Sequence, residues 1–94
     1  MSVYLISYDL HSPDTKRELV EKAIQSLGVS RKFLTTTYLV STYSSSSTIT
    51  ATITEHFHGN DRLIVSTVDK DFYGKPAING WLTQSEWDWI KSNL

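Results

Sequence analysis

Ninety-four residues, no cysteine and a formal net charge of −1 set the first limits on this chain. The length predicts one domain spanning residues 1–94, and the missing thiols exclude a disulfide framework and a thiolate metal site. Nine Lys and Arg against ten Asp and Glu argue against a strongly electrostatic nucleic-acid binder, although a local basic patch remains open. We find no secretory signal and no apolar run of about 20 residues, which predicts a soluble, cytoplasmic protein with no membrane partner.

The stretch "VYLISYD" is the first predicted element, a strand. Val3 and Leu5 fall on one face of it, and Tyr4, Ile6 and Tyr8 fall on the other. Because both faces carry large residues, we expect an interior strand that is covered on each side.

A helix follows this strand. Ser12 is a good N-cap, Pro13 suits the first helical position, and Gly28 is the expected stop. Glu18 and Lys22 are spaced to form a pair on the solvent side. The predicted apolar stripe consists of Leu19, Val20, Ala23, Ile24 and Leu27.

Residues 30–42 contain many β-branched and aromatic residues and no helix signals, so we expect them to be extended. Thirteen residues exceed the usual strand length of about 5 or 6. The polar run at 35–37 therefore predicts a bend or bulge between two short strands.

The segment "YSSSSTITATITEHFHG" is ambiguous. Ile49, Ala51 and Ile53 alternate as in a strand, whereas Ile49, Ile53 and Phe57 follow the helical spacing of four. The serines supply N-caps and Gly59 supplies a stop, so we favour a helix.

The rest of the chain gives a turn at 60–61, a strand over 62–68 and a loop over 69–80. Thr83 and Glu86 then form a capping box that opens a short terminal helix. Its apolar face is expected to consist of Trp87, Ile90 and Leu94.

This order of elements predicts an α+β fold. We expect a ferredoxin-like sandwich, in which an antiparallel sheet carries two helices on one face, plus a short C-terminal helix. Residues 77–94 would form a tryptophan-rich C-terminal extension of the domain.

Asp9 closes the first strand and has two interpretations. It can turn the chain toward the helix, as Asp often does. Alternatively its carboxylate can bind Mg²⁺, which proteins usually hold through one or two carboxylates and waters. One carboxylate makes a weak site, and two copies at a dimer axis would make a better one.

The basic doublets Lys16–Arg17 and Arg31–Lys32 are candidate nucleic-acid contacts. The first doublet lies in the opening turn of a helix, where the dipole disfavours cations, so phosphate would relieve the cost. A neighbouring Glu18 could do the same, and solvated surface is the favoured interpretation of both doublets.

Two further groups of polar residues have weak metal signatures. His56, His58 and Asp61 match no standard zinc spacing, and the helix dipole accounts for histidine near a helix end. Asp69 and Asp71 are interpreted as part of a solvated loop.

Three tryptophans, Trp81, Trp87 and Trp89, lie within the last fourteen residues. At least one must be exposed if the terminal helix is amphipathic, which suggests an interface with a protein partner. The alternative is that they cover one edge of a thin core.

The stretch "VYLISYDL", the helix with basic residues in its first turn, Gly28 and the strand "SRKFLTTTYLV" together resemble the CRISPR-associated Cas-two family. The closing "GWLTQSEWDWI" is similar to the tryptophan-rich tails of uncharacterised relatives in that superfamily. The resemblance implies a ferredoxin-like homodimer in which two copies of Asp9 face each other and hold Mg²⁺ for phosphodiester cleavage. Other members are scaffolds that only bind nucleic acid or protein.

Two hypotheses follow. The first is a Mg²⁺-dependent endonuclease for RNA or DNA, in which Asp9 binds the metal and His11 acts as a general acid. The second is a non-catalytic dimeric binding module for nucleic acid or a protein. Both assume a twofold dimer with "SRKFLTTTYLV" as a plausible pairing edge and Asp9 near the axis.

Overall fold

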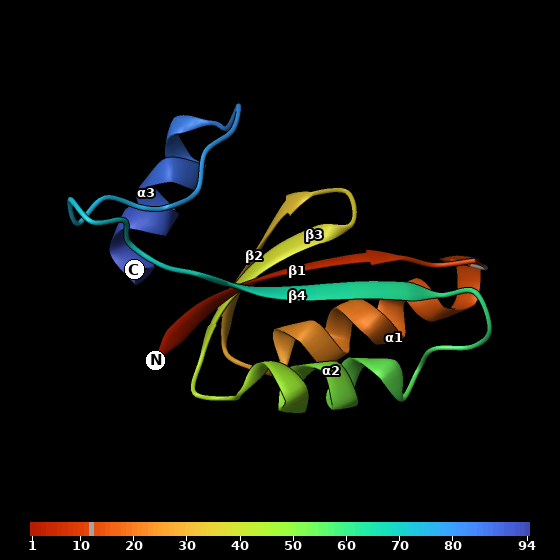
Figure 1. The fold of residues 1–94 in the computed structure, drawn as a ribbon. Helices are drawn as coiled ribbons and strands as arrows, with labels where there is room; N and C mark the ends of the chain where they lie inside the picture. Colours follow the sequence, from red (N-terminus) through yellow and green to blue (C-terminus); the bar gives the residue numbers. More distant parts are fainter. Residues whose placement is uncertain (12) are drawn as a thin grey trace.

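A computed structural model of the chain describes residues 1–11 and 13–94. Its elements, in chain order, are β1 (Ser2–Asp9), α1 (Pro13–Gln25), β2 (Val29–Leu34), β3 (Thr37–Thr42), α2 (Ser46–Thr54), β4 (Arg62–Val68) and α3 (Gln84–Asn93). The strands form one antiparallel sheet in the order β2-β3-β1-β4 (Figure 1). This is the ferredoxin-like arrangement, and it confirms the predicted fold class.

The helices α1 and α2 cover one face of the sheet (Figure 1), here called the helix face. Ile6 from the interior strand β1 is fully buried there, between neighbours from both helices. The buried members of this cluster are Tyr4, Ile6, Tyr8, Val20, Ile24, Tyr38, Val40, Ile49 and Ile53. The alternation predicted for β1 is therefore confirmed on this face.

The opposite face, here called the second face, is partly covered by the C-terminal segment, residues 69–94. Val3, Leu39 and Val68 from the sheet are buried against Ile90 of α3. Trp87 and Trp89 pack against this cluster, and Trp89 lies edge-on to the ring of Phe33. The predicted terminal helix begins at its capping box as expected. Figure 1 shows α3 on the side of the sheet away from α1 and α2.

The other local predictions fare well, with two corrections. The helix that was expected to stop at Gly59 already ends at Thr54, with Glu55 as its C-cap. The turn at residues 35–36 separates β2 from β3, and the ambiguous segment is a helix capped by the Ser45 side chain. Glu18 and Lys22 form the predicted ion pair. The prediction that Leu19 lies on the buried stripe of the helix is wrong, because its side chain is about half exposed. The neighbouring Val20 is fully buried. The sheet covers a narrower stripe of α1 than the apolar pattern suggested. The predicted N-cap, at position 12, lies outside the described residues.

Position 28 has no room for a side chain, so a glycine is required there. It follows the end of α1, and a Cβ atom at this position would collide with the backbone carbonyl oxygen of Ser41 in β3. The hydroxyl of Thr42 donates to the Leu27 carbonyl at 2.7 Å beside this contact. The α1–β2 connection is therefore held tightly against the sheet.

Among the described residues, no helix is both long and apolar enough to cross a membrane.

Candidate functional site

Asp9 lies at the end of β1 on the second face of the sheet, where the C-terminal segment does not reach it. Alternation from Val3 puts Ser7 and Asp9 on this face, and Asp9 is exposed. Arg62 is its direct partner in β4. A shallow depression of about 350 Å³ is lined here by Ser7, Tyr8, Asp9, Arg62, Leu63 and Ile64. The position combines one carboxylate, one guanidinium and open access.

His11, the predicted general acid, is exposed just after Asp9. Its backbone N–H donates to Asp61 Oδ1 at 2.7 Å. The contact that positions His11 is thus a backbone contact.

Asp61 is the best-connected carboxylate in this region, and the sequence did not single out its role. It accepts the backbone N–H groups of His11 and His58, at 2.7 and 2.8 Å, and pairs with Lys16 Nζ at 2.6 Å. The ammonium of Lys16, followed by the two backbone donors, holds the pKa of Asp61 well below its usual range. Its side chain has no exposed surface. Asp61 therefore ties the β1–α1 connection, α1 and the α2–β4 loop together.

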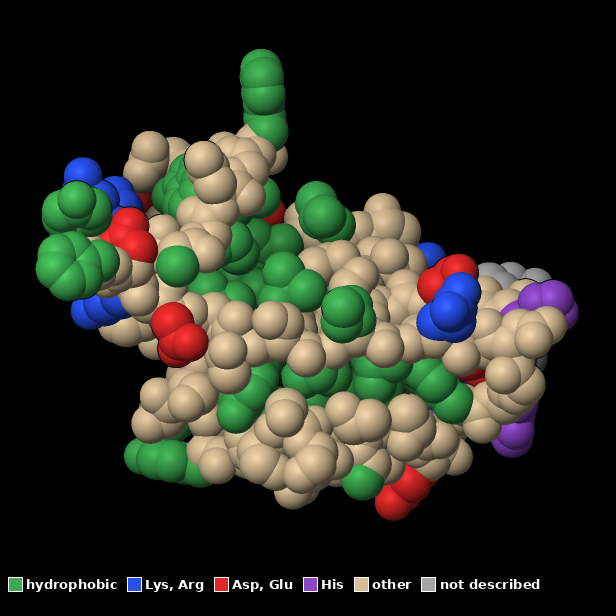
Figure 2. All heavy atoms as spheres, in the orientation of Figure 1, with side chains coloured by type: hydrophobic (Ala, Val, Ile, Leu, Met, Phe, Trp, Pro, Cys, Tyr) green, Lys and Arg blue, Asp and Glu red, His purple; other side chains and the backbone are tan. Residues whose placement is uncertain are grey.

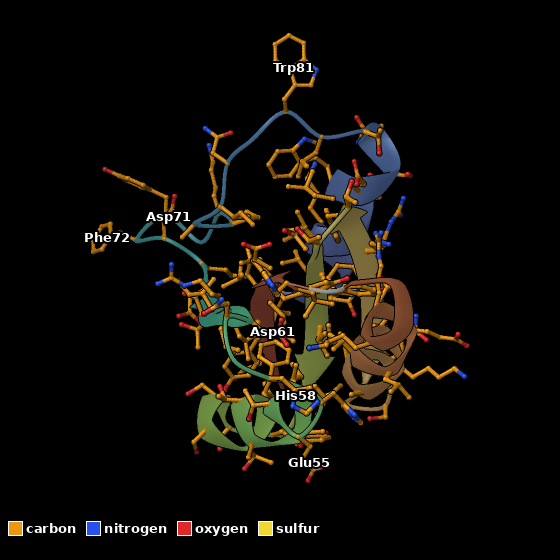
Figure 3. The ribbon with its side chains drawn as sticks, turned by 90° about the vertical axis from the view of Figure 1, so that its right-hand side faces the viewer. Glu55, His58, Asp61, Asp71, Phe72 and Trp81 are labelled. Atoms are coloured by element: carbon orange, nitrogen blue, oxygen red, sulfur yellow. The ribbon has the colours of Figure 1, made fainter. Side chains whose placement is uncertain are left out.

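The suspected metal cluster around Asp61 is a loop-organising contact of the kind just described. Asp61 binds the backbone of His58 (Figure 3), and both of its oxygens are engaged by donors. Over residues 1–11 and 13–94, no group of three or more His, Asp or Glu side chains gathers in a way that could hold a metal ion. A second copy of the chain could supply a further carboxylate beside Asp9.

The four candidate nucleic-acid contacts all have partners within the protein. Lys16 pairs with Asp61, as described above. Arg17 donates to the Thr35 carbonyl at 2.8 Å, and Arg31 donates to Ser85 Oγ at 2.9 Å. Arg17 and Lys32 both reach Glu21, at 3.5 and 2.8 Å, and Arg31 also lies over the Phe33 ring. These four cations hold helices, strands and the C-terminal segment together.

Glu21 is a second carboxylate whose role the sequence did not reveal. Besides Lys32 and Arg17 it accepts the Tyr8 hydroxyl at 2.7 Å. Burial acts to raise the pKa of Glu21, but donation from Lys32, Tyr8 and Arg17 outweighs it, so the pKa is lowered. Burial, and then the bond to Glu21, raises the pKa of Tyr8 well above its usual range. The helical spacing of Arg17 and Glu21 was the one local signal of this cluster.

The C-terminal segment carries three large aromatic side chains that the fold leaves outside. Phe72 is 95 % exposed, Tyr73 is 82 % exposed and Trp81 is fully exposed. Figure 3 shows Trp81 at the tip of this segment, pointing away from the molecule, and Phe72 also pointing outward. The prediction that at least one tryptophan is exposed is confirmed. Asp71 organises the turn by accepting the N–H groups of Tyr73 and Lys75, as expected for a loop residue.

Trp81 borders an apolar pocket of about 220 Å³ between the C-terminal segment and the second face. Its lining residues are Leu5, Phe33, Leu34, Thr37, Leu39, Ile78, Asn79, Gly80, Trp81 and Leu82. Ser7 and Thr37, whose hydroxyls are 3.1 Å apart, separate this pocket from the Asp9 depression. The uncovered part of the second face therefore has an apolar half and a charged half.

Fold and site together define an α+β ferredoxin-like domain whose second face is half covered by its own C-terminal segment. No protein-family model, curated protein or solved structure matches the chain. The resemblance to the Cas-two family accordingly remains a prediction.

Proposed function

We propose that this protein is a non-catalytic binding module that engages a protein partner through the C-terminal segment. The supporting observation is the nearly complete exposure of Phe72, Tyr73 and Trp81. Tryptophan and tyrosine are enriched among the residues that dominate binding energy at interfaces. Trp87 and Ile90 pack in the core cluster of the second face, whereas the three exposed rings belong to neither core cluster.

The charges favour a protein partner over nucleic acid. Affinity for nucleic acid comes largely from Lys and Arg side chains that neutralise phosphates. Lys16, Arg17, Arg31 and Lys32 are engaged in intramolecular contacts, which a phosphate backbone would have to replace. The net charge of −1 adds no long-range attraction.

Partner capture by the tagged full-length protein tests this proposal. We expect Trp81→Ala to lower partner affinity at least about tenfold, because truncating a central interface tryptophan commonly costs more than about 2 kcal/mol. Tyr43→Ala is the matched control, since Tyr43 is 87 % exposed but lies in the β3–α2 connection. Equal recovery with wild type and Trp81→Ala, together with loss in Tyr43→Ala, would place the surface elsewhere and refute the proposal.

A Mg²⁺-dependent endonuclease is the second candidate, and the pairing of Asp9 with Arg62 favours it. Carboxylate oxygen is the ligand that Mg²⁺ prefers, and a guanidinium binds phosphate well. The two side chains are neighbours on an open surface. A second Asp9, from another copy, would supply the additional carboxylate, and His11 would be the nearby proton donor.

The nuclease candidate is tested with single-stranded RNA and duplex DNA, with Mg²⁺ or with EDTA. We expect Mg²⁺-dependent cleavage by wild type and none by Asp9→Asn. Asp69→Asn is the control, because Asp69 is also an exposed carboxylate directly after a strand. Cleavage that persists in Asp9→Asn would rule out this site.

A further inference from the structure

The two edge strands of the sheet differ in their protection against pairing. In β2, Arg31 and Lys32 carry charge, and the register with β3 shifts between Lys32 and Leu34. Charges and bulges are the devices by which proteins block edge strands. In β4, residues 63–68 contain no charged residue, no proline and no glycine, and Ile64 is 63 % exposed. The β4 edge is open to another strand.

The helix beside this edge is also free of charge. The α2 sequence SSTITATIT contains no ionisable side chain, although Ser46, Thr48 and Ala51 are exposed. Its threonines Thr50, Thr52 and Thr54 donate to carbonyls one turn back, at 2.9, 2.9 and 2.7 Å. Their hydroxyls are therefore satisfied within the helix, and this surface can lose water at little cost. The cores of interfaces are depleted in charged residues, and in serine and alanine as well, so the missing charge of α2 supports the strand edge only as a permissive neighbour.

Both features lie on one side of the molecule, here called the β4–α2 surface (residues 63–68 and 46–54). Figure 3 shows α2 beneath the β4 side of the sheet and α1 beneath the other side. In Figure 2, which views the molecule from the β4 side, charged side chains gather toward the ends of this face. The atoms between those ends are mostly uncharged.

We propose that β4 pairs antiparallel with β4 of a second copy, about a twofold axis at Ile64. This axis stands perpendicular to the sheet, so the helix faces of both copies lie on the same side. Ile64 then lies opposite Ile64 of the second copy. In the same way Leu63 lies opposite the second copy's Val65, and Arg62 lies opposite its Ser66. No charge opposes a like charge, and the most exposed apolar side chain of the strand becomes covered.

We assign a second copy of the chain as the partner of the β4 edge, because in this register each β4 residue lies opposite a compatible residue of the same strand. Leu63 and Val65 already pack against the core of the helix face, so their pairing extends that core across the axis. The two α2 helices would flank the axis on the same side. A self-complementary patch related by a twofold axis is the commonest way to close an oligomer. This surface shares no residue with the aromatic positions proposed above, so either proposal can fail without the other.

Light scattering on the full chain tests the pairing. We expect a wild-type mass near twice 10.7 kDa at micromolar concentration. Ile64→Lys should halve that mass by placing a charge on the edge. Leu34→Lys is the matched control, since Leu34 is 59 % exposed on the other edge strand, and it should stay dimeric. A monomeric wild type, or dissociation by Leu34→Lys but not by Ile64→Lys, would overturn the proposal.

Cross-linking gives a second readout that does not depend on weakening the protein. The chain has no cysteine, so a single introduced cysteine can form a disulfide only with the same cysteine of another molecule. Residues directly opposite in antiparallel strands have Cα atoms about 4.5 to 5.5 Å apart, within the range for a disulfide. We expect Ile64→Cys to form a covalent dimer on mild oxidation and Leu34→Cys to remain monomeric on a denaturing gel. Equal cross-linking of the two variants would contradict the assigned edge.

Discussion

Replacing Ile90 by alanine tests whether the C-terminal segment belongs to the same cooperative unit as the sheet. Ile90 is 1 % exposed and lies between Val3, Leu39 and Val68. If α3 were a loosely attached extension, a defect in it would release the helix locally. If the second face depends on α3, the whole domain would lose stability.

The size of the effect follows from burial. The change removes about three methylene equivalents at about 0.8 kcal/mol each, and an unrelaxed cavity adds to that loss. We therefore expect a decrease of about 3 kcal/mol in the free energy of unfolding, within the range of about 2 to 5 for such changes. With a urea dependence of about 1.5 kcal/mol per molar, the unfolding midpoint should fall by about 2 M.

Urea unfolding followed by circular dichroism measures this shift. Ile53→Ala is the matched control, because Ile53 is a fully buried isoleucine in the helix-face cluster. We expect both variants to lower the midpoint by similar amounts with unchanged slopes. An Ile90→Ala midpoint equal to wild type, alongside a clear shift for Ile53→Ala, would refute the view that α3 is part of the core.

Two further predictions concern the connections around the sheet. Gly28→Ala should destabilise the protein by about 2 kcal/mol or more, because the new Cβ atom meets a backbone carbonyl of β3 that cannot move freely. Gly80→Ala is the control, because its Cβ atom would have only an ordinary contact at 3.9 Å, and its melting temperature should stay near that of wild type. Equal decreases in melting temperature for the two variants would contradict this reasoning. Stability should also fall in acid, because folding lowers the pKa of Asp61 and of Glu21. Their contribution is present above the ordinary carboxyl pKa of about 4 and is lost as pH falls through the lower folded pKa values. The urea midpoint should therefore drop between about pH 5 and pH 2, and less steeply in Asp61→Asn. Equal slopes for both proteins would show that Asp61 does not carry this dependence.

Local signals were enough to predict the elements of this fold. The alternation in β1, the capping box at Thr83 and Glu86, and the polar interruption at 35–37 can each be recognised within a short stretch of sequence. The ferredoxin-like order then follows from few choices, because consecutive elements tend to pack as neighbours. Periodicity describes one helix at a time, however, and it could not show that the sheet leaves Leu19 outside.

The polar clusters were beyond sequence reasoning because they join residues far apart in the chain. Asp61 reaches Lys16 across 45 positions and His11 across 50. Glu21 meets Tyr8 and Lys32 only once β1, α1 and β2 have packed. A carboxylate in a sequence carries no sign of which donors will surround it. The partners of the candidate residues therefore emerged only from the structure.

Pairing through β4 and a metal shared by two Asp9 residues exclude each other, which gives a last prediction. Asp9 faces Arg62, one strand inward from β4 and two residues from the axis at Ile64. With strands about 4.8 Å apart and a rise of about 3.4 Å per residue, the two Asp9 Cα atoms would lie about 20 Å apart. A Mg²⁺ ion must lie about 2 Å from each ligand oxygen, so two aspartates cannot share it at that separation.

The cross-linked Ile64→Cys dimer makes this exclusion measurable. If wild type cleaves nucleic acid through two converging Asp9 residues, locking the β4 edges together should abolish cleavage, and a reducing agent should restore it. Leu34→Cys, treated with the same oxidant, controls for chemical damage. Undiminished cleavage by the covalent dimer, still dependent on Asp9, would show that one carboxylate is sufficient and would refute the shared-metal mechanism. Because the two Asp9 residues would lie about 20 Å apart in the locked dimer, we expect no Mg²⁺-dependent cleavage from it if the mechanism needs both carboxylates on one ion.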